Sequence, residues 1–423
     1  MRALYSLLLT LSLPLLVARL WWRGQRLPAY RQRIAERFGA VTRAAQQLDP
    51  AKPTLWIHAV SVGETIAATG LMEQLLATQR FNLLVTTTTP TGSERLLASF
   101  AGRVVHVYAP YDVPWLVGRF LRAMRPSAYV VMETELWPNT LAACRCAGIQ
   151  VLLANARLSA KSARGYARFA GLSREIMANL SGVAAQNAVD GQRFMDLGLA
   201  PDKLQITGNI KFDASLAPAT LAAAAQLKTS FNGRPVVIAG STHEGEEAML
   251  LSAFAQLRTA LPNALLILAP RHPDRFESVA QLCIERGFTL AKRSNPLPLT
   301  PDVAILLGDT LGELTLLYGT ADVAFIGGSL IQRGGHNMLE AAIWGIPVLS
   351  GPWVFNFQTI ADSLAAAGGL AGVHTAEDVV SAWLELLGNP VLRAERGAKA
   401  QAYVEQNRGA LERLVTMVNR LLN

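Results

Sequence analysis

The stretch TLWIHAVSVGETIAATGLMEQLLATQRFNLLVTTT, residues 54–88, decides the fold class. Thr54–Val60 is a short run of apolar residues and predicts a buried strand. Glu64–Thr78 has apolar residues at helical spacing, and Leu83–Thr88 is a second strand candidate rich in Val and Thr. A strand, a helix and a strand at this spacing are typical of a parallel βαβ unit.

The same alternation continues along the chain, thins near Ile210–Pro218, where turn-forming residues collect, and then restarts. Further strands are expected at Arg103–Tyr108, Ala128–Met132, Val151–Ala154, Val236–Ala239, Ala264–Leu268, Val303–Leu307, Val323–Ile326 and Val348–Leu349. Helices are expected at Trp115–Met124, Leu141–Ala147, Glu244–Ala260, Arg275–Arg286, Leu311–Tyr318, Asn337–Trp344 and Ala376–Leu387. The chain is therefore predicted to be α/β, with two doubly wound parallel-sheet halves joined near residues 210–225.

The composition fits folded domains with apolar cores. Charged residues make up 17% of the 423 residues and hydrophobic residues 51%, which excludes a disordered protein. The three cysteines form no CxxC pair, which argues for a reducing compartment and against a structural zinc site. The net charge is +8, but residues 1–45 carry eight arginines and one acid. The rest of the chain is close to neutral, so we expect no nucleic-acid partner.

The N-terminal segment is best explained as a membrane anchor. Ala3–Ala18 is nearly all apolar, and Arg19, Trp21 and Trp22 follow it. Such a segment can just span a bilayer or dip into it, with the tryptophans at the interface. The positive flank after the apolar run predicts that the body of the protein is cytoplasmic. A cleaved signal peptide and a buried first helix are the alternatives.

In doubly wound sheets, ligands bind beyond the carboxyl ends of the strands, so the residues after each strand are the site candidates. Glu64 follows the first strand and opens a helix, whose N-terminus favours a charged carboxylate able to act as a base. Glu133 and Glu135 follow the Ala128–Met132 strand. Lys211 lies at the entry to the linker and could neutralise charge on a leaving phosphate. The plainer alternatives are a helix cap, an acidic loop and a solvated lysine.

In the second half, glycine-rich turns follow successive strands. Glycines ahead of a helix expose backbone N–H groups, which together make a phosphate site. Arg271 is a natural bidentate partner for a phosphate. We expect a nucleotide site from these segments, although each turn alone could be structural. They are Gly240–Glu244, Ala269–His272, Gly308–Glu313, Gly327–Ser329 and Gly334–Asn337.

Three common site motifs are absent from the sequence. There is no GxGxxG fingerprint and no GxxxxGK[ST] loop, which disfavours a dinucleotide oxidoreductase and a P-loop NTPase. No HExxH or other metal-ligand spacing occurs either, and no metal is expected.

Nine blocks, in order and with matching spacing, resemble the 3-deoxy-D-manno-octulosonic acid (Kdo) transferases of lipopolysaccharide inner-core synthesis. The resemblance runs from the N-terminal segment to at least Gln358. One departure is visible, because the family commonly has LEPA where this chain has LEAA at residues 339–342. The blocks are SVGE (61–64), TPTGSERL (89–96), METELWPN (132–139), NARLS (155–159), GSTHEGEE (240–247), PRHPDRF (270–276), GDTLGEL (308–314), FIGGS (325–329) and GGHNMLEAA (334–342).

The resemblance implies the GT-B architecture, with two facing Rossmann-like domains, and metal-independent, inverting transfer of Kdo from CMP-Kdo to a tetra-acylated lipid A precursor. Glu64 matches the catalytic base, and Glu133 and Lys211 match positions that stabilise the transition state. No cofactor is implied beyond the donor substrate. The donor-binding segments that the resemblance implies contain Pro270, Arg271, Leu311, Gly312, Glu313, Asn337, Met338, Leu339 and Glu340.

The expected organisation is an anchor at 1–22, an acceptor-binding domain at 23–210, a linker at 211–225 and a donor-binding domain at 226–423. The expected location is the cytoplasmic face of the inner membrane, where Arg23, Arg26, Arg31 and Arg33 would meet the acceptor's phosphates. One or two Kdo additions are compatible with the motifs. The alternatives are a GT-B transferase that moves a sugar from UDP to a lipid, and a non-enzymatic membrane scaffold.

Overall fold

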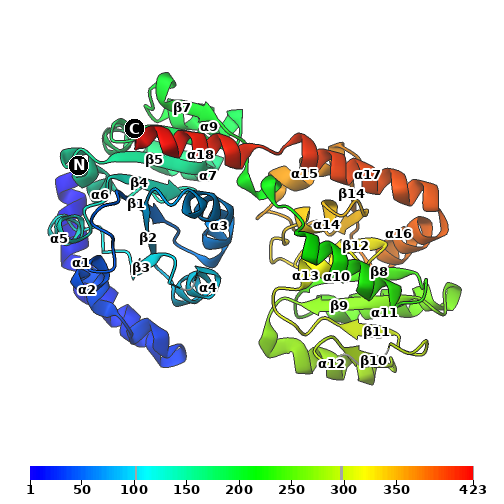
Figure 1. The fold of residues 1–423 in the computed structure, drawn as a ribbon. Coiled ribbons are helices and arrows are strands. Elements are labelled where there is room, and N and C mark those ends of the chain that lie inside the picture. Colours follow the sequence, from blue (N-terminus) through cyan, green and yellow to red (C-terminus); the bar gives the residue numbers. More distant parts are fainter. Residues whose placement is uncertain (101, 296–298, 423) are drawn as a thin grey trace. The chain divides into compact units, whose positions relative to one another are not determined.

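The computed structural model describes residues 1–423 except 101, 296–298 and 423. The chain forms two compact domains (Figure 1). The N-terminal domain contains Met1–Asp213 and Arg408–Asn423, and the C-terminal domain contains Ala214–Asn407. Each domain has its own sheet and its own core.

The N-terminal domain is built on a seven-stranded parallel sheet with the order β3-β2-β1-β4-β5-β6-β7. Its strands are β1 (Thr54–His58), β2 (Asn82–Thr87), β3 (Val105–Tyr108), β4 (Ala128–Met132), β5 (Gln150–Ala156), β6 (Gly182–Ala185) and β7 (Leu204–Ile206). Its helices are α1 (Arg2–Arg26), α2 (Thr42–Ala45), α3 (Val62–Ala77), α4 (Pro90–Phe100), α5 (Pro114–Met124), α6 (Pro138–Cys146), α7 (Ala160–Ala167), α8 (Ala170–Ala178), α9 (Ala188–Asp196) and α18 (Ala410–Leu421). Short 3₁₀ turns are η1 (Pro28–Arg31), η2 (Ile34–Phe38), η3 (Pro201–Lys203) and η4 (Ile210–Asp213).

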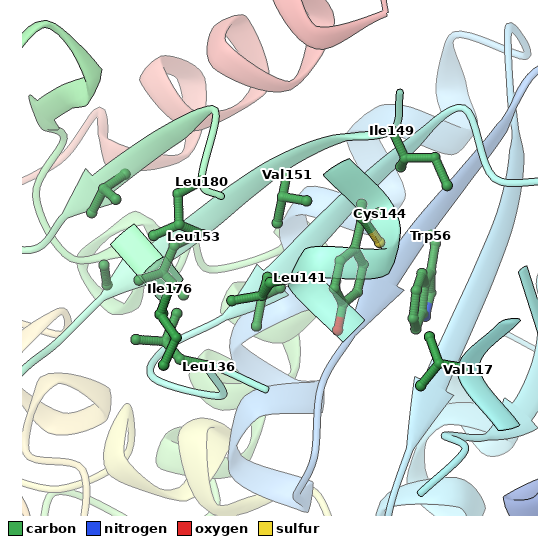
Figure 2. Packing of buried hydrophobic residues seen from close by; sticks show 14 of the residues in the cluster. Trp56, Val117, Leu136, Leu141, Cys144, Ile149, Val151, Leu153, Ile176 and Leu180 are labelled. Atoms are coloured by element: carbon green, nitrogen blue, oxygen red, sulfur yellow. The ribbon is translucent and has the colours of Figure 1, made fainter. Parts of the chain in front are cut away.

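Hydrophobic clusters cover both faces of this sheet. On one face Trp56 stacks on Tyr129, with ring centroids 3.7 Å apart, and packs against Phe120 of α5. Figure 2 shows Trp56 and Val117 in this cluster. On the other face, α3, α4 and α18 cover Leu55 and Ile57. Because side chains alternate along a strand, the buried TLWIH run supplies both cores.

The C-terminal domain also has a seven-stranded parallel sheet, in the order β10-β11-β9-β8-β12-β13-β14. Its strands are β8 (Val236–Thr242), β9 (Leu265–Pro270), β10 (Leu290–Lys292), β11 (Ile305–Leu307), β12 (Val323–Ile326), β13 (Val348–Ser350) and β14 (Leu370–Gly372). Its helices are α10 (Pro218–Thr229), α11 (Glu246–Ala260), α12 (Phe276–Glu285), α13 (Leu314–Tyr318), α14 (Leu339–Ala342), α15 (Gln358–Ala366), α16 (Ala376–Gly388) and α17 (Pro390–Gln406), with a 3₁₀ turn η5 (Pro273–Arg275).

The predicted class, two doubly wound parallel sheets, is confirmed. Every expected strand is present within a few residues, whereas β6, β7, β10 and β14 were not foreseen. These strands have only three or four residues, with the sequences GVAA, LQI, LAK and LAG. Such segments are too short to show the alternation of apolar and polar residues that predicts a strand.

Two expected boundaries differ from the structure. The range 226–423 assigned the last helix to the second domain, but α18 packs on the sheet of the first. The expected linker at 211–225 is largely ordered, because it contains the end of η4 and much of α10. The physical reason for the first difference is an amphipathic α18, whose Ala410, Leu414 and Val418 are buried against the N-terminal core.

Asp213 joins the two ends of the N-terminal domain. Its carboxylate accepts hydrogen bonds from the backbone N–H groups of Gly409, at 2.6 Å, and Leu411, at 2.8 Å. It therefore caps α18 from a distant part of the chain, as a local N-cap residue would.

Asp213→Ala is expected to lower the free energy of unfolding of the N-terminal domain by about 1–2 kcal/mol, because two N–H groups at the start of α18 lose their acceptor. Urea unfolding followed by circular dichroism measures the change. Asp202→Ala, at an exposed aspartate in η3, is the control. Equal stability of the two variants would contradict the capping role.

Helix α1 is long and apolar enough to cross a membrane by length and composition. It is continuous over 25 residues despite Pro14. Both chain ends belong to the N-terminal domain (Figure 1).

Candidate functional site

The N-terminal sheet reverses its strand order between β1 and β4, which pair directly through His58 and Val131. A reversal point of this kind is where doubly wound sheets bind ligands. Glu64 lies on α3 just after β1, and Glu133 follows β4. The structure thus brings together two acids that are 69 positions apart in the sequence (133 minus 64).

Glu64 is largely buried, and its carboxylate is held at the start of α3. It accepts hydrogen bonds from the backbone N–H of Val60, at 2.6 Å, and from the Ser61 hydroxyl, at 3.2 Å. Ser61 is the N-cap of α3, so Glu64 does take part in helix capping. A role for Glu64 as a helix cap therefore does not exclude a role as a base.

Burial raises the pKa of Glu64 to about 7, and the nearby charges of Glu133 and Glu135 act in the same direction. The hydrogen bonds from Val60 and Ser61 oppose this change but are smaller in effect. Desolvation thus outweighs the helix N-terminus, and the carboxylate that we expected to be charged is only partly ionised at neutral pH. A carboxyl group with a pKa near neutrality can both take up and release a proton at pH 7.

Glu133 has a strained backbone, with a φ of 58°. This left-handed conformation is uncommon outside glycine and occurs often at functional sites. Its N–H donates to the carbonyl of Ala154 at 2.9 Å, which fixes the turn at the end of β4. Glu135 accepts a hydrogen bond from the Trp137 indole at 3.0 Å. Glu133 and Glu135 therefore have different surroundings, as is possible for two residues at positions i and i+2 after a strand.

Lys211 lies in η4, in the N-terminal domain and after the last strand of its sheet. Asn155, at the end of β5, is fully buried and accepts the backbone N–H of Ile210 at 3.2 Å. Asn209 donates to Gln186, which in turn donates to the Asn155 carbonyl. These bonds hold the Lys211 segment at the carboxyl end of the sheet, the end that also carries Glu64 and Glu133.

The C-terminal sheet reverses between β8 and β12. The side chain with the most hydrogen bonds at this point, that of Glu246, was not predicted as a site residue. Glu246, fully buried at the start of α11, accepts hydrogen bonds from four backbone N–H groups. The donors are His243 at 3.2 Å, Gly328 at 2.6 Å, Ser329 at 2.9 Å and Leu330 at 3.0 Å.

The Gly327–Ser329 turn was expected to present its N–H groups to a phosphate. That expectation is wrong, because the Glu246 carboxylate already occupies the N–H groups of Gly328 and Ser329. Gly327 instead allows the end of β12 to pack closely against the end of β8. A Cβ there would lie 2.3 Å from the carbonyl oxygen of Ser241, so only glycine allows the two strand ends to approach.

A cluster of basic side chains surrounds this end of the C-terminal sheet. His243 and His336 share a hydrogen bond between their Nε2 atoms at 2.7 Å, and His272 packs edge-on against His243. Burial, followed by the charges of His272 and of neighbouring arginines including Arg271, lowers the pKa of His243 to about 4. Burial and His243 lower the pKa of His336 to about 3. His243 and His336 are therefore neutral at pH 7.

The remaining expected donor-binding residues differ in accessibility. Arg271, Leu311 and Gly312 are exposed, whereas Met338 and Leu339 are buried in the core. Contacts from the two buried residues to a ligand would therefore come from their backbone. Glu313 accepts hydrogen bonds from Arg293 at 2.9 Å and Thr310 at 2.5 Å.

Asn337 and Glu340 hold each other at the start of α14. The Asn337 amide donates to Glu340 at 3.0 Å, and its oxygen accepts the backbone N–H of Leu339. Burial raises the pKa of Glu340, while Asn337 and Arg271 oppose that change. Pro270 ends β9, and the N–H of Arg271 donates to the Thr242 carbonyl at 3.0 Å. These segments therefore meet at the carboxyl ends of β8 and β9.

Comparison with known proteins identifies the family. The profile of the 3-deoxy-D-manno-octulosonic-acid transferase (kdotransferase) family matches residues 32–214. A 3-deoxy-D-manno-octulosonic acid transferase of Haemophilus influenzae is 40% identical over 425 residues, covering 100% of this chain and 99% of the relative. The chain belongs to this family. The corresponding protein of Bordetella pertussis is 37% identical, with 97% of each chain covered.

Membership of the Kdo transferase family makes the chain a glycosyltransferase, as the resemblance implied. Among solved structures, a UDP-GlcNAc 2-epimerase from Neisseria meningitidis has a TM-score of 0.58 and 15% identity, covering 87% of this chain and 100% of that chain. At this identity the likeness concerns the fold alone, and it supports the predicted GT-B-like pair of parallel-sheet domains.

Arg33 was expected to meet acceptor phosphates, but it has partners within the chain. It pairs with Glu36 at 2.7 Å and donates to the carbonyl of His106 at 2.9 Å. Arg33 thus fastens the segment after α1 to the sheet. Of the other arginines given this role, Arg23 stacks over Tyr30 and Arg31 over Trp21, while the side chain of Arg26 lies outside the described part of the structure.

The sequence placed His243 and His336 in segments expected to form the nucleotide site, but it did not predict the contact between them or the role of Glu246. The available signal was their position, since each follows a predicted strand end. Among the described residues, no group of three His, Cys, Asp or Glu side chains is arranged to hold a metal ion.

Proposed function

We propose that the enzyme transfers Kdo from CMP-Kdo to the tetra-acylated lipid A precursor (lipid IVA), in lipopolysaccharide core biosynthesis. A hydroxyl oxygen of the acceptor attacks the anomeric carbon of Kdo, and the bond from that carbon to CMP breaks. The attack comes from the face opposite CMP, so the configuration inverts. The hydroxyl proton passes to Glu64, and CMP leaves with the electron pair of the broken bond.

The observation that supports this proposal most is the state of Glu64. Its pKa of about 7 suits a general base at neutral pH, because the carboxylate is populated and still takes up a proton readily. Glu64 also lies at the reversal point of the N-terminal sheet, where doubly wound folds bind ligands. Membership of a family of Kdo transferases supports the same assignment.

We assign Glu133 and Lys211 to transition-state stabilisation, as the resemblance implies. Both lie at the carboxyl end of the N-terminal sheet. Lys211 supplies a positive charge that can offset charge on the departing phosphate. The strained backbone of Glu133 supports a functional role, since such strain persists mainly where the surrounding structure enforces it.

We assign donor binding to the C-terminal domain, through Pro270–Arg271, Leu311–Glu313 and Asn337–Glu340. The charges of Arg271, Arg275 and Arg333 act together on His243. This positive potential suits the phosphate of a cytidine monophosphate. The proposed reaction uses no metal ion and no further cofactor.

The proposed location is the cytoplasmic face of the inner membrane. The acceptor is a lipid, and α1 offers an apolar surface next to a basic segment. One or two successive additions fit the proposal, since a single base can serve each acceptor in turn.

Mass spectrometry of the lipid product tests the proposal directly. Purified protein is incubated with the tetra-acylated precursor and CMP-Kdo made in situ. A mass gain of one or two Kdo units is expected, and the number of additions follows from the spectrum. A folded protein that binds CMP but gives no product would overturn the acceptor assignment, and preference for UDP over CMP in calorimetry would overturn the donor.

Arg271→Ala is expected to weaken binding of CMP-Kdo by about 10–100-fold, because a charge-assisted contact to a phosphate is worth about 1.5–3 kcal/mol. The donor KM should rise while the acceptor KM stays the same. Calorimetry with CMP and steady-state kinetics measure the two effects. Arg286→Ala, at an exposed arginine after α12, is the matched control. An unchanged donor KM in Arg271→Ala would remove this residue from the donor site.

A further inference from the structure

Helix α1 has two faces of different character. The outer face consists of large apolar side chains that are 56–72% exposed, and these are Leu4, Leu7, Leu8, Leu11, Leu15 and Trp22. The inner face carries the more shielded residues, among them Arg2, Tyr5, Ser6 and Thr10. The shielded face thus holds the polar side chains together with other leucines, such as Leu9 and Leu13, whereas the outer face is apolar from Leu4 to Leu15. A helix with polar groups confined to one side can lie at an interface.

The inner face is attached to the domain by polar contacts near its N-terminal end. Arg2 pairs with Glu175 of α8 at 3.0 Å. The Tyr5 hydroxyl donates to Asp112 at 3.0 Å, and the Ser6 hydroxyl donates to Asn139 at 2.8 Å. At the other end Leu20 and Gly24 are buried. The first turns of α1 are therefore held by the body of the N-terminal domain, and its last turns are covered by the η1 segment, whose Arg31 lies against Gly24.

We propose that α1 lies in the plane of the membrane surface and does not cross the bilayer, with its outer face inserted among the lipids and its inner face fixed to the acceptor domain. Membrane lipid is the partner because the exposed face is apolar from Leu4 to Leu15 and is continued by Trp22. Trp21, Trp22 and Arg19 at one end provide the residues that favour the interface with an anionic lipid surface.

Length alone does not decide between the two orientations. A helix of 25 residues is about 37 Å long, enough to cross a hydrocarbon core of about 30 Å. A crossing helix, however, would separate Arg2 from the cytoplasmic side by that thickness. The Arg2–Glu175 and Tyr5–Asp112 contacts would then be lost, or the charged groups of the domain would enter hydrocarbon, where they are costly. The in-plane orientation keeps every contact.

The contact between Tyr5 of α1 and Asp112 also connects α1 to the proposed acceptor site. Asp112 is buried and accepts hydrogen bonds from the backbone N–H groups of Asn139 and Thr140, at the start of α6. Helix α6 follows directly on the segment that contains Glu133 and Glu135. An in-plane α1 therefore fixes the height of this segment above the lipids, which suits an acceptor whose sugar projects from the membrane surface. This consequence rests on the proposed lipid acceptor, whereas the orientation itself does not.

Cross-linking of the full-length protein in native membranes tests the orientation. Arg2→Cys and Glu175→Cys are combined in a Cys146→Ala background, which removes an exposed thiol. A short bifunctional thiol reagent should link the pair within one chain, as shown by mass spectrometry of the joined peptides. Leu11→Cys with Glu175→Cys is the control, because Leu11 points outward, and it should not be linked.

A link in detergent that is lost in membranes would overturn the proposal, and so would a missing link in both. Links only between two copies would instead assign the outer face to self-association. Spin labels at Leu4, Leu11 and Trp22, in vesicles of phosphatidylethanolamine and phosphatidylglycerol, provide a second measurement. Equal depths are expected, whereas a greater depth at Leu11 than at the two ends would show a crossing helix. Neither measurement depends on Kdo transfer, so their failure is distinct from failure of the proposed reaction.

Discussion

Glu64→Gln is expected to lower kcat for Kdo transfer by about 10²–10⁴-fold, the usual contribution of a general base. Glutamine keeps the size of the side chain and can still accept the N–H of Val60, so the start of α3 should survive. It cannot take up the proton of the acceptor hydroxyl. CMP binding should remain unchanged, because the proposed donor residues belong to the C-terminal domain.

The matched control is Glu73→Gln, on the same helix. Glu73 is exposed and pairs with Arg103 at 2.6 Å, away from the proposed site. Surface pairs of this kind contribute little, so activity should stay near that of the parent enzyme. Steady-state kinetics with the tetra-acylated lipid would measure both variants. Turnover of Glu64→Gln within a factor of a few of the parent would eliminate Glu64 as the base.

The pH dependence provides an independent test of the same assignment. Because the pKa of Glu64 is raised to about 7, the carboxylate form becomes more populated as the pH rises through 7. The value of kcat/KM should therefore increase from pH 6 to pH 8 and level off above it. A Glu64→Gln variant with residual activity should lose this increase.

Whereas kcat/KM should rise with pH, the contribution of Glu64 to the free energy of unfolding should fall as the pH rises. The folded protein holds the Glu64 proton up to about pH 7, while an unfolded chain releases it near pH 4.5. The raised pKa therefore costs stability increasingly between these values, and the full cost is present above pH 7. Glu64→Gln removes it, so the variant should be more stable than the parent at pH 8, by up to about 3 kcal/mol. Urea unfolding at pH 5 and pH 8 would show the difference.

The sequence predicted the fold class and the N-terminal acids because both depend on local patterns. Strand β1 and the start of α3 are encoded by adjacent residues, and Glu133 follows a strand of five apolar or aromatic residues. Periodicity locates such strands, and the doubly wound topology then brings their ends together. The state of Glu64 was not predictable, because its pKa depends on how much water the folded domain excludes.

Long-range contacts account for the other misses. Helix α18 carries a strong amphipathic pattern, but nothing in that pattern tells which sheet it covers. The hydrogen bonds from Gly409 and Leu411 to Asp213 decide this, across about half of the chain. Likewise, the glycine-rich turn at Gly327–Ser329 has the composition of a phosphate site, while its actual partner is a carboxylate 82 positions earlier than Gly328.

That carboxylate belongs to Glu246, and its removal should strongly destabilise the C-terminal domain. Glu246→Ala is expected to lower the free energy of unfolding of the C-terminal domain by about 3 kcal/mol or more. The reason is that the backbone N–H groups of Gly328, Ser329 and Leu330 would be left without their buried acceptor. Thermal unfolding followed by calorimetry measures the loss, and Glu244→Ala, at an exposed acid in the same motif, is the control.

The chemistry of the turn allows a sharper test than stability alone. In Glu246→Ala the freed N–H groups form an anion site at the reversal point of the sheet, as the composition of the turn first indicated. Formate or acetate should then raise the Tm of Glu246→Ala, and leave the Tm of the parent and of Glu244→Ala unchanged. Loss of the turn should also weaken CMP binding, because Gly328 packs against His336, which directly precedes the Asn337–Glu340 segment. Formate or acetate should partly restore that binding.

Two results would contradict this account of Glu246. One is a Glu246→Ala variant as stable as Glu244→Ala, which would mean that water satisfies the turn without cost. The other is a destabilised variant that no small carboxylate rescues, which would assign the loss to the cavity and not to the N–H groups. Rescue by formate and not by a neutral isostere such as formamide separates these cases, because only an anion restores four charge-assisted hydrogen bonds.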